Sequence, residues 1–345
     1  MERPHPAGVV EDGWNRLVGG ALRARGWRHL VVPHVGYAGA DFVRVLARVV
    51  LAPVPDPDRT GGERRHDEQR YRRGWRNFVT AEAPDVEVTV TVRGAVHTAR
   101  TDRSGMLDVR VPNPGLPPSW QDVVVEAPGS DPTVARVLVV AADEDFGIVS
   151  DIDDTVIRTY LPRPLIAAYN TFVLQEQARS PVPGMASLYD ALLRKHPGAP
   201  TVYVSTGAWN TAGTLTRFLT RNAFPAGPLL LTDWGPTNTG WFRSGREHKL
   251  ACLEALAADF PRIRWVLVGD DGQHDPAIYA DFARRHPDRV RAVAIRELTA
   301  TQQVLAHGTP VERLDADPEH VPAGIPNARG EDGDALALAL APHLP

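Results

Sequence analysis

The sequence predicts an α/β protein in two parts: a small antiparallel β-sandwich followed by a parallel sheet with helices on both faces. In the first part, short strands follow one another with Pro/Gly turns and no helical pattern between them, as in a sandwich. In the second part, short apolar runs alternate with helical segments, which is typical of βαβ units. We place the β-sandwich domain at residues 1–143, the parallel-sheet domain at 144–307 and a C-terminal tail with a short helix at 308–345.

The composition is that of an ordinary globular protein and excludes several classes. Of the 345 residues, 43% are hydrophobic and 23% are charged, which favours a sizeable core over wholesale disorder. The net charge of -4 argues against a protein that coats nucleic acid. Cys252 is the only cysteine, so an internal disulfide framework and a multi-cysteine metal site are excluded. Only Lys195 and Lys249 are lysines, and every other basic residue among the 38 is arginine.

The distribution of apolar and charged residues along the sequence also indicates where the protein is located. No run reaches the length of about 18 apolar residues that a membrane-spanning helix needs. Charged residues through the first twenty positions interrupt the apolar core that a signal peptide requires. We therefore expect a cytoplasmic protein, with peripheral contact at a membrane as the alternative.

Strands of the first domain are predicted from their apolar patterns. Residues 42–51 are rich in Val and Leu, and 86–92 alternate Val with Glu and Thr, the period of a half-buried strand. Further short strands are expected at 107–111, 123–125 and 134–140. Together they form the predicted sandwich.

A basic, aromatic insertion interrupts this domain near residues 53–82. Tyr71, Trp75 and Phe78 recur at helical spacing. Six arginines surround them: Arg64, Arg65, Arg70, Arg72, Arg73 and Arg76. Such a helix can lie on an anionic membrane surface. The alternative, a helix that packs its aromatic stripe on the sandwich, is favoured because most aromatic stripes belong to a core.

The parallel sheet is predicted from five apolar runs, which are 146–149, 202–204, 229–231, 266–268 and 293–295. Helical segments are expected between them, near 211–222, 247–259 and 276–285. Ligands of such sheets bind at the carboxyl ends of the strands. The residues directly after each run are therefore the candidates for a functional site.

Two acids, Asp151 and Asp153, follow the first run. Neighbouring buried carboxylates destabilise a protein unless a cation or tight hydrogen bonding offsets their repulsion. A helix N-terminus, where acids and Thr155 are also favoured, explains the pattern equally well when it is taken alone. An EF-hand loop is excluded, because Val156 and Pro162 stand where it needs Gly and Glu.

Two further strand ends carry polar residues. Ser205 and Thr206 follow the second run, and hydroxyls beside the amides of a helix start can bind a phosphate oxygen. Taken alone, ordinary helix capping is the favoured interpretation of these two residues. Asp270, Asp271 and Asp275 follow the run that ends at 268, and hard carboxylate oxygens of this kind suit Mg²⁺.

These residues together carry a family resemblance. The segment 151–155, Asp-Ile-Asp-Asp-Thr, resembles the DxDxT signature of haloacid-dehalogenase-like phosphatases. Ser205 matches their second motif, Lys249 the third, and Asp270 with Asp275 the fourth. Over roughly residues 145–298 the sequence is similar to one branch, the Mg²⁺-dependent phosphatidate phosphatases first known from fungal actin patches.

The resemblance implies a Rossmann-like core and a Mg²⁺-dependent phosphatase that hydrolyses a phosphomonoester through an aspartyl-phosphate. The implied catalytic residues are Asp151 as nucleophile, Asp153 as general acid and base, and Thr155. The implied phosphate-binding residues are Ser205, Thr206 and Lys249. The implied metal ligands are Asp151, Asp153, Asp270 and Asp275.

The substrate that the resemblance favours is phosphatidate, which yields diacylglycerol and phosphate. One alternative is a soluble phosphomonoester or a phosphoprotein. Another is a non-catalytic adaptor that binds metal and recruits a partner through the β-sandwich. A nucleic-acid partner is not expected.

Overall fold

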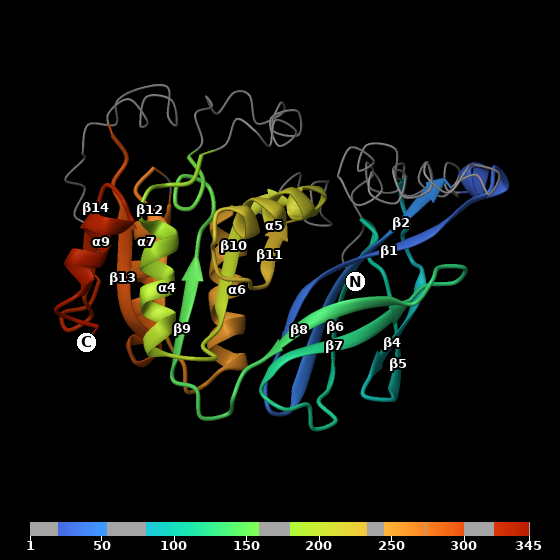
Figure 1. Ribbon diagram of the computed structural model, residues 1–345, viewed down its shortest axis with the longest axis horizontal. Helices are drawn as coiled ribbons and strands as arrows, with labels where there is room; N and C mark the ends of the chain where they lie inside the picture. The colour runs from blue at the N-terminus through green and yellow to red at the C-terminus, as the bar shows by residue number, and fades with distance from the viewer. Residues whose placement is uncertain are drawn as a thin grey trace. The chain divides into compact units, whose positions relative to one another are not determined.

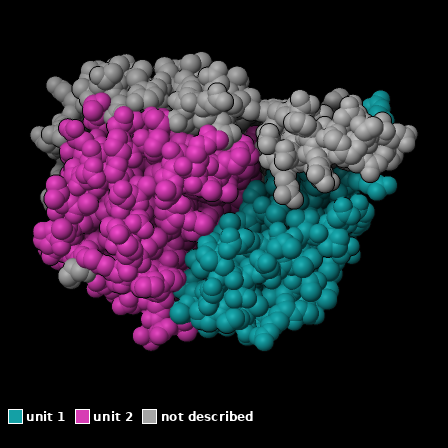
Figure 2. Space-filling view, in the orientation of Figure 1, with its two compact units in different colours: residues 1–141, 233–243 teal, residues 142–232, 244–345 magenta. Residues whose placement is uncertain are grey.

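A computed structural model describes residues 20–53, 81–158, 180–232, 245–272, 274–299 and 321–344 (Figure 1). The chain divides into two compact units, the first comprising 1–141 with 233–243 and the second 142–232 with 244–345 (Figure 2). The arginine-rich insertion at Arg64–Arg76 lies outside the described residues. Within the described residues, no helix is long and apolar enough to cross a membrane.

The first unit is built on one mixed sheet of eight strands. They are β1 (Trp27–Ala38), β2 (Phe42–Pro53), β3 (Ala81–Glu82), β4 (Glu87–Val92), β5 (Ala95–Arg100), β6 (Met106–Pro112), β7 (Ser119–Glu126) and β8 (Thr133–Val139). The strand order is β3-β2-β1-β8-β7-β4-β5, and β6 also pairs with β2. The pair β1–β8 is parallel, whereas the sequence predicts only antiparallel pairs in this domain. No hairpin links β1 to β8, so the chain is free to run in the same direction through both.

The alternating pattern of the strands explains their core. In β4, the valines at 88, 90 and 92 are fully buried, while the residues between them are half-buried. Valines from β2, β4 and β7 belong to one hydrophobic cluster, so a single core serves this sheet. Burying a valine stabilises a fold by about 1.5–3 kcal/mol, which makes this alternation the main determinant of strand register.

The second unit contains a six-stranded sheet in which every pair is parallel. Its strands are β9 (Phe146–Ser150), β10 (Thr201–Ala208), β11 (Leu229–Thr232), β12 (Arg264–Asp270), β13 (Val290–Arg296) and β14 (Asn327–Gly330). The order is β11-β10-β9-β12-β13-β14. After β9 the chain first adds strands on one side, then returns to add strands on the other. The order reverses at β9, and in such sheets ligands bind at the carboxyl ends of the strands where the order reverses.

Five α-helices and two short 3₁₀ helices are described in this unit. They are α4 (Met185–Lys195), η4 (Trp209–Thr211), α5 (Ala212–Arg221), α6 (Gly245–Asp259), α7 (Asp275–Arg285), η5 (Pro287–Arg289) and α9 (Gly333–Leu340). Helix α4 packs with α9, and α6 packs with α7. All five residues of β9 are buried, as expected for a central strand with neighbours on both sides.

The C-terminal segment, residues 321–344, is part of the second unit. Its strand β14 extends the sheet beside β13, and no predicted apolar run corresponds to this strand. Its helix α9 is formed by an apolar stretch near the C-terminus, within the tail for which a short helix is predicted. The Gly333 amide donates to the Pro183 carbonyl at 2.9 Å, so the start of α9 sits directly against the segment that enters α4.

Replacing Gly333 with alanine is expected to lower the melting temperature of the protein. A Cβ at Gly333 would collide with the backbone of Gly184 and Met185, which cannot move as a side chain can. Overpacking of this kind typically costs about 1–3 kcal/mol. Gly213→Ala in α5 is the matched control, because a Cβ there meets only the Arg217 side chain at 3.5 Å. Thermal unfolding should separate the two variants, and equal melting temperatures would show that the contact of α9 with α4 is loose.

Candidate active site

The carboxyl ends of three neighbouring strands bring the predicted site residues together. Strand β9 lies between β10 and β12, and Ser150 pairs with Tyr203 on one side and Val268 on the other. The residues that follow, Asp151 and Asp270, therefore emerge side by side. The Asp151 amide donates to the Val268 carbonyl at 2.9 Å, which holds the first acid against β12.

Three buried carboxylates form the centre of the site. Asp151, Asp270 and Asp275 are 3%, 1% and 0% exposed, and one ligand atom of each lies within 4.8 Å of the others. Asp275 is the first residue of α7, and Gly269 leaves the space that its carboxylate occupies. Within the described part of the chain, Oδ2 of Asp270 and Oδ2 of Asp275 are buried without a hydrogen-bond partner. Buried oxygens with unused lone pairs are costly, and a hard cation such as Mg²⁺ would satisfy them.

Among the described residues, Lys249 is the cation that forms ion pairs with this group of carboxylates. It lies in the second turn of α6, and its Nζ is 2.7 Å from Asp151 Oδ1 and 2.5 Å from Asp275 Oδ1. Burial alone would lower the pKa of Lys249, but attraction to the two carboxylates outweighs burial and raises it. The ammonium therefore stays charged and holds the two acids in place.

Two of the three buried acids, Asp151 and Asp270, have a raised pKa. Burial raises the pKa of Asp151 to about 8, against the opposing attraction of Lys249 and with the help of the Asp275 charge. Burial also raises the pKa of Asp270 well above its ordinary value, again reinforced by Asp275. The single positive charge of Lys249 cannot neutralise three buried carboxylates. The electrostatics thus favour a second cation at the site.

The loop after β9, residues 151–157, is called the β9 loop below. It forms turns rather than the helix start that was the alternative explanation of its acids. Asp154 adopts a left-handed conformation with φ of 56°, and its amide donates to the Ile157 carbonyl at 2.8 Å. Thr155 Oγ1 donates to Asp151 Oδ2 at 3.3 Å, which fits its predicted role of orienting this acid. The loop thereby closes around the Asp151 carboxylate.

Asp153 in the β9 loop and Ser205 within β10 face one another. Ser205 Oγ donates to Asp153 Oδ2 at 3.1 Å and accepts the Gly207 amide at 3.0 Å. The Asp153 carboxylate is therefore outside the group formed by the other three acids and close to the predicted phosphate-binding residue. Thr206 is only half-buried, and its carbonyl accepts Thr232 Oγ1 at 2.8 Å.

Three residues that support the site were missed in the sequence. The hydroxyls of Tyr189 in α4 and Ser150 share a hydrogen bond of 2.6 Å. The Ser150 hydroxyl also donates to the Asp151 carbonyl at 2.6 Å. Tyr279 of α7 donates to the Val268 carbonyl at 3.0 Å. Arg296 ends β13, and its Nη1 donates to the carbonyl of Asp154 in the β9 loop. Arg296 directly follows the predicted apolar run 293–295, and this position is a signal that the sequence does contain. The two tyrosines do not follow an apolar run and carry no such signal.

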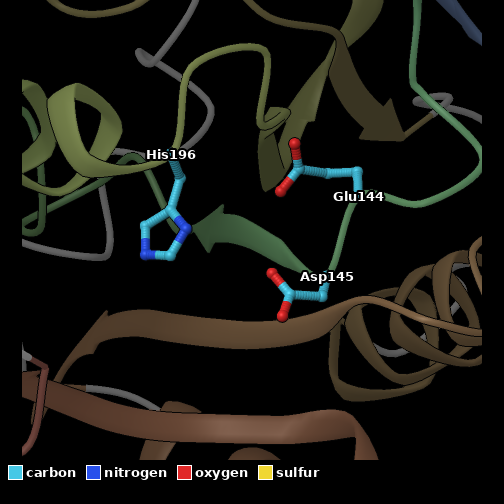
Figure 3. Close-up of side chains that lie close together, drawn as sticks. All are labelled: Glu144, Asp145 and His196. Carbon is cyan, nitrogen blue, oxygen red and sulfur yellow. The ribbon is translucent and has the colours of Figure 1, made fainter.

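A second group of potential ligand side chains lies at the opposite end of β9. Glu144, Asp145 and His196 approach within 4.8 Å, and Figure 3 shows a ring nitrogen of His196 turned toward the two acids. The His196 ring stacks on Phe146 with centroids 3.9 Å apart, and Glu144 Oε1 accepts the Phe146 amide at 3.0 Å. Glu144 and Asp145 directly precede β9, whereas the carboxylate group of Asp151, Asp270 and Asp275 lies at its carboxyl end. We therefore assign them no part in the reaction.

The comparison with known families covers the sheet that carries this site. Residues 146–297 match the family described as the phosphatidate phosphatase APP1 catalytic domain. The predicted resemblance to phosphatidate phosphatases is confirmed for this segment. All eight predicted site residues lie inside this segment: Asp151, Asp153, Thr155, Ser205, Thr206, Lys249, Asp270 and Asp275.

Two fungal proteins are similar over the same length. Phosphatidate phosphatase APP1 of Saccharomyces cerevisiae is 28% identical over 154 residues, which cover 44% of this chain and 26% of the yeast protein. An uncharacterized protein of Schizosaccharomyces pombe is 25% identical over 154 residues, covering 44% of this chain and 25% of its own. The chain thus matches about a quarter of the length of these relatives.

A comparison with solved structures gives a much weaker likeness. The carbohydrate acetylesterase from Xanthomonas citri aligns with 92% of this chain and 75% of its own at 13% identity, with a TM-score of 0.28. A score this low supports no conclusion about the fold or the chemistry.

Proposed function

We propose that the second unit is a Mg²⁺-dependent phosphatase with a haloacid-dehalogenase-like core, and that its substrate is phosphatidate. One observation carries the proposal: Asp151, Asp270, Asp275 and Lys249 form a buried group at the carboxyl end of β9. This group lies within the segment that matches a phosphatidate phosphatase catalytic domain. Neither a helix cap nor an exposed acidic loop would need four ionisable groups in contact without solvent.

Asp151, Asp270 and Asp275 are the residues that would hold Mg²⁺, with the Asp153 backbone carbonyl as a further ligand. Bound Mg²⁺ would neutralise phosphate charge, so that a carboxylate can approach a phosphorus atom. The unused Oδ2 atoms of Asp270 and Asp275 support this assignment.

Asp151 then acts as nucleophile. Its carboxylate oxygen forms a bond to phosphorus as the bond from phosphorus to the leaving oxygen breaks, which gives an aspartyl-phosphate. Asp153 donates a proton to the leaving alcohol. In the second step Asp153 takes a proton from water, the resulting hydroxide attacks phosphorus, and phosphate leaves with the Asp151 carboxylate restored.

The surrounding residues prepare these steps. Thr155 holds one oxygen of Asp151, and Lys249 holds the other, so the carboxylate cannot rotate freely. Ser205 restrains Asp153 through its hydroxyl, and a phosphoryl oxygen can take that hydrogen bond when substrate binds. Lys249 offsets negative charge that accumulates around phosphorus in the transition state.

The activity and the substrate can be tested together. Mg²⁺-dependent phosphate release is measured from phosphatidate in detergent micelles and from a panel of water-soluble phosphomonoesters. We expect a clear preference for phosphatidate in micelles. Equal rates would contradict the lipid assignment, while no release from any substrate would contradict the phosphatase assignment and leave the adaptor alternative.

Mg²⁺ binding has its own test, which does not depend on turnover. Saturating Mg²⁺ is expected to raise the melting temperature of the wild type, since a ligand at 100 times its Kd stabilises the folded state by about 2.7 kcal/mol. Asp270→Asn should lose this shift. Without Mg²⁺ this variant should be at least as stable as the wild type, because the substitution removes repulsion with Asp275 and Asp151.

Asp190→Asn is the control for this experiment. Asp190 pairs with Arg194 on the exposed surface of α4, 3.1 Å apart, and its removal should leave the Mg²⁺ shift intact. If Asp270→Asn kept the full shift, Asp270 would not be a ligand.

A further inference from the structure

Arg296, the last residue of β13, is the most deeply buried arginine in the described residues, at 2% exposed. An arginine in such a place costs free energy unless its donors are satisfied. Its guanidinium reaches two backbone carbonyls: Nη1 donates to the Asp154 carbonyl at 2.5 Å, and Nε donates to the Glu331 carbonyl at 3.1 Å. The side chain therefore joins the β9 loop to the C-terminal segment.

The Asp154 end of this link meets an uncommon backbone conformation. A non-glycine residue with φ of 56° is in the left-handed region and keeps that conformation only when its surroundings hold it. The Asp154 amide is bound to Ile157, and its carbonyl is bound to Arg296. Asp154 stands between Asp153 and Thr155, so its conformation sets where those two side chains point.

The Glu331 end is fixed by the sheet. Arg296 pairs with Gly330 in the parallel register of β13 and β14, and the Glu297 amide donates to the Gly330 carbonyl at 2.8 Å. The same segment continues into α9, which packs on α4, the helix that carries Tyr189. Tyr189 in turn holds Ser150, directly before the β9 loop.

Arg296 is unsuited to bind phosphate itself. Two of its donors are committed to main-chain carbonyls, and its side chain is almost inaccessible to solvent. Its chemical effect must therefore pass through the loop that it holds.

We propose that Arg296 is a positioning residue of the phosphatase site, and that through it the C-terminal segment, which lies beyond the matched family segment, holds the β9 loop in its reactive conformation. This inference rests on the proposed function for its kinetic consequence but not for its structural one. It goes beyond the predicted motif residues, because neither Arg296 nor the segment 321–344 belongs to them.

The test compares Arg296→Gln, Arg296→Lys and the wild type as full-length proteins. Loss of a buried, charge-assisted hydrogen bond should lower kcat by about tenfold to a hundredfold. KM should change little, because Arg296 does not contact substrate. Arg296→Lys, which has one compact donor head in place of a fork, should lose less activity than Arg296→Gln but not reach the wild type.

Hydrogen exchange measured on the same proteins separates positioning from general destabilisation. Amides of residues 154–157 should exchange at least tenfold faster in Arg296→Gln, while those of β10 keep their wild-type rates. Arg285→Gln is the control, because Arg285 makes exposed ion pairs with Glu254 and Asp281 in the same unit. It should leave both kcat and the exchange of the β9 loop unchanged.

The outcomes are distinct. Faster exchange confined to the β9 loop supports the inference, even if no phosphatase activity is found, in which case only the proposed function fails. Wild-type exchange in this loop with wild-type kcat would overturn the inference. Faster exchange throughout the parallel sheet would also overturn it, since Arg296 would then be a general stabilising residue.

Discussion

Asp151→Asn is expected to abolish phosphate release, with kcat lowered by thousands-fold or more. An amide side chain at position 151 cannot form the aspartyl-phosphate, so the first step of the proposed reaction is lost. The protein should remain folded and be no less stable than the wild type, because burial disfavours the Asp151 carboxylate in the absence of Mg²⁺ and raises its pKa to about 8. The measurement is Mg²⁺-dependent phosphate release beside a thermal melt of each protein.

The control for this prediction is Asp145→Asn at the other end of the same strand. Asp145 is exposed and directly precedes β9, whereas Asp151 is buried and directly follows it. The control should keep wild-type kcat. Comparable activity of Asp151→Asn and the wild type would remove the nucleophile assignment and the proposed reaction with it.

Lys249→Met is expected to have the second largest effect and to act on both stability and catalysis. Methionine matches the length of lysine but leaves Asp151 and Asp275 buried against one another without the ammonium. Breaking a buried ion pair in this way costs about 3–5 kcal/mol. Loss of charge stabilisation around phosphorus should lower kcat by about a hundredfold to a thousandfold.

Added Mg²⁺ should recover part of the lost stability of Lys249→Met, because a cation offsets the same repulsion, but it should not restore kcat. Lys195→Met, at the only other lysine of the chain, tests lysine removal itself; its Nζ contacts the Leu344 carbonyl at 3.1 Å, away from the acids. A melting temperature of Lys249→Met equal to that of the wild type would show that the contacts of Lys249 with the two acids contribute nothing to stability.

Much of the candidate site could be predicted because its residues follow apolar runs. Asp151 directly follows β9 and Asp270 ends β12, whereas Ser205 follows the predicted run 202–204 but lies inside β10, which continues to Ala208. The apolar runs of these strands are visible in the sequence. Lys249 could not be found in this way, since it lies inside α6. It was identified from the order of the motifs and from the scarcity of lysine in the chain.

Other features depend on contacts that no local pattern encodes. The short strand β14 has only four residues, and its partner β13 is thirty residues away along the chain. The parallel pair β1–β8 joins segments separated by most of the first unit, so its direction is set by how the sheet assembles. The assignments of Tyr189 and Arg296 to the site follow from the same kind of long-range packing.

The sequence by itself determined which residues are candidates for the site, because acids and hydroxyls that follow apolar runs are local features of composition and order. Only the tertiary structure decided how they divide: Asp270 and Asp275 join Asp151 and Lys249, while Asp153 turns to Ser205. It also decided that a left-handed Asp154 is held by an arginine from another strand. The physical reason is that charge interactions and hydrogen bonds act over a few ångströms in space, whatever the separation along the chain.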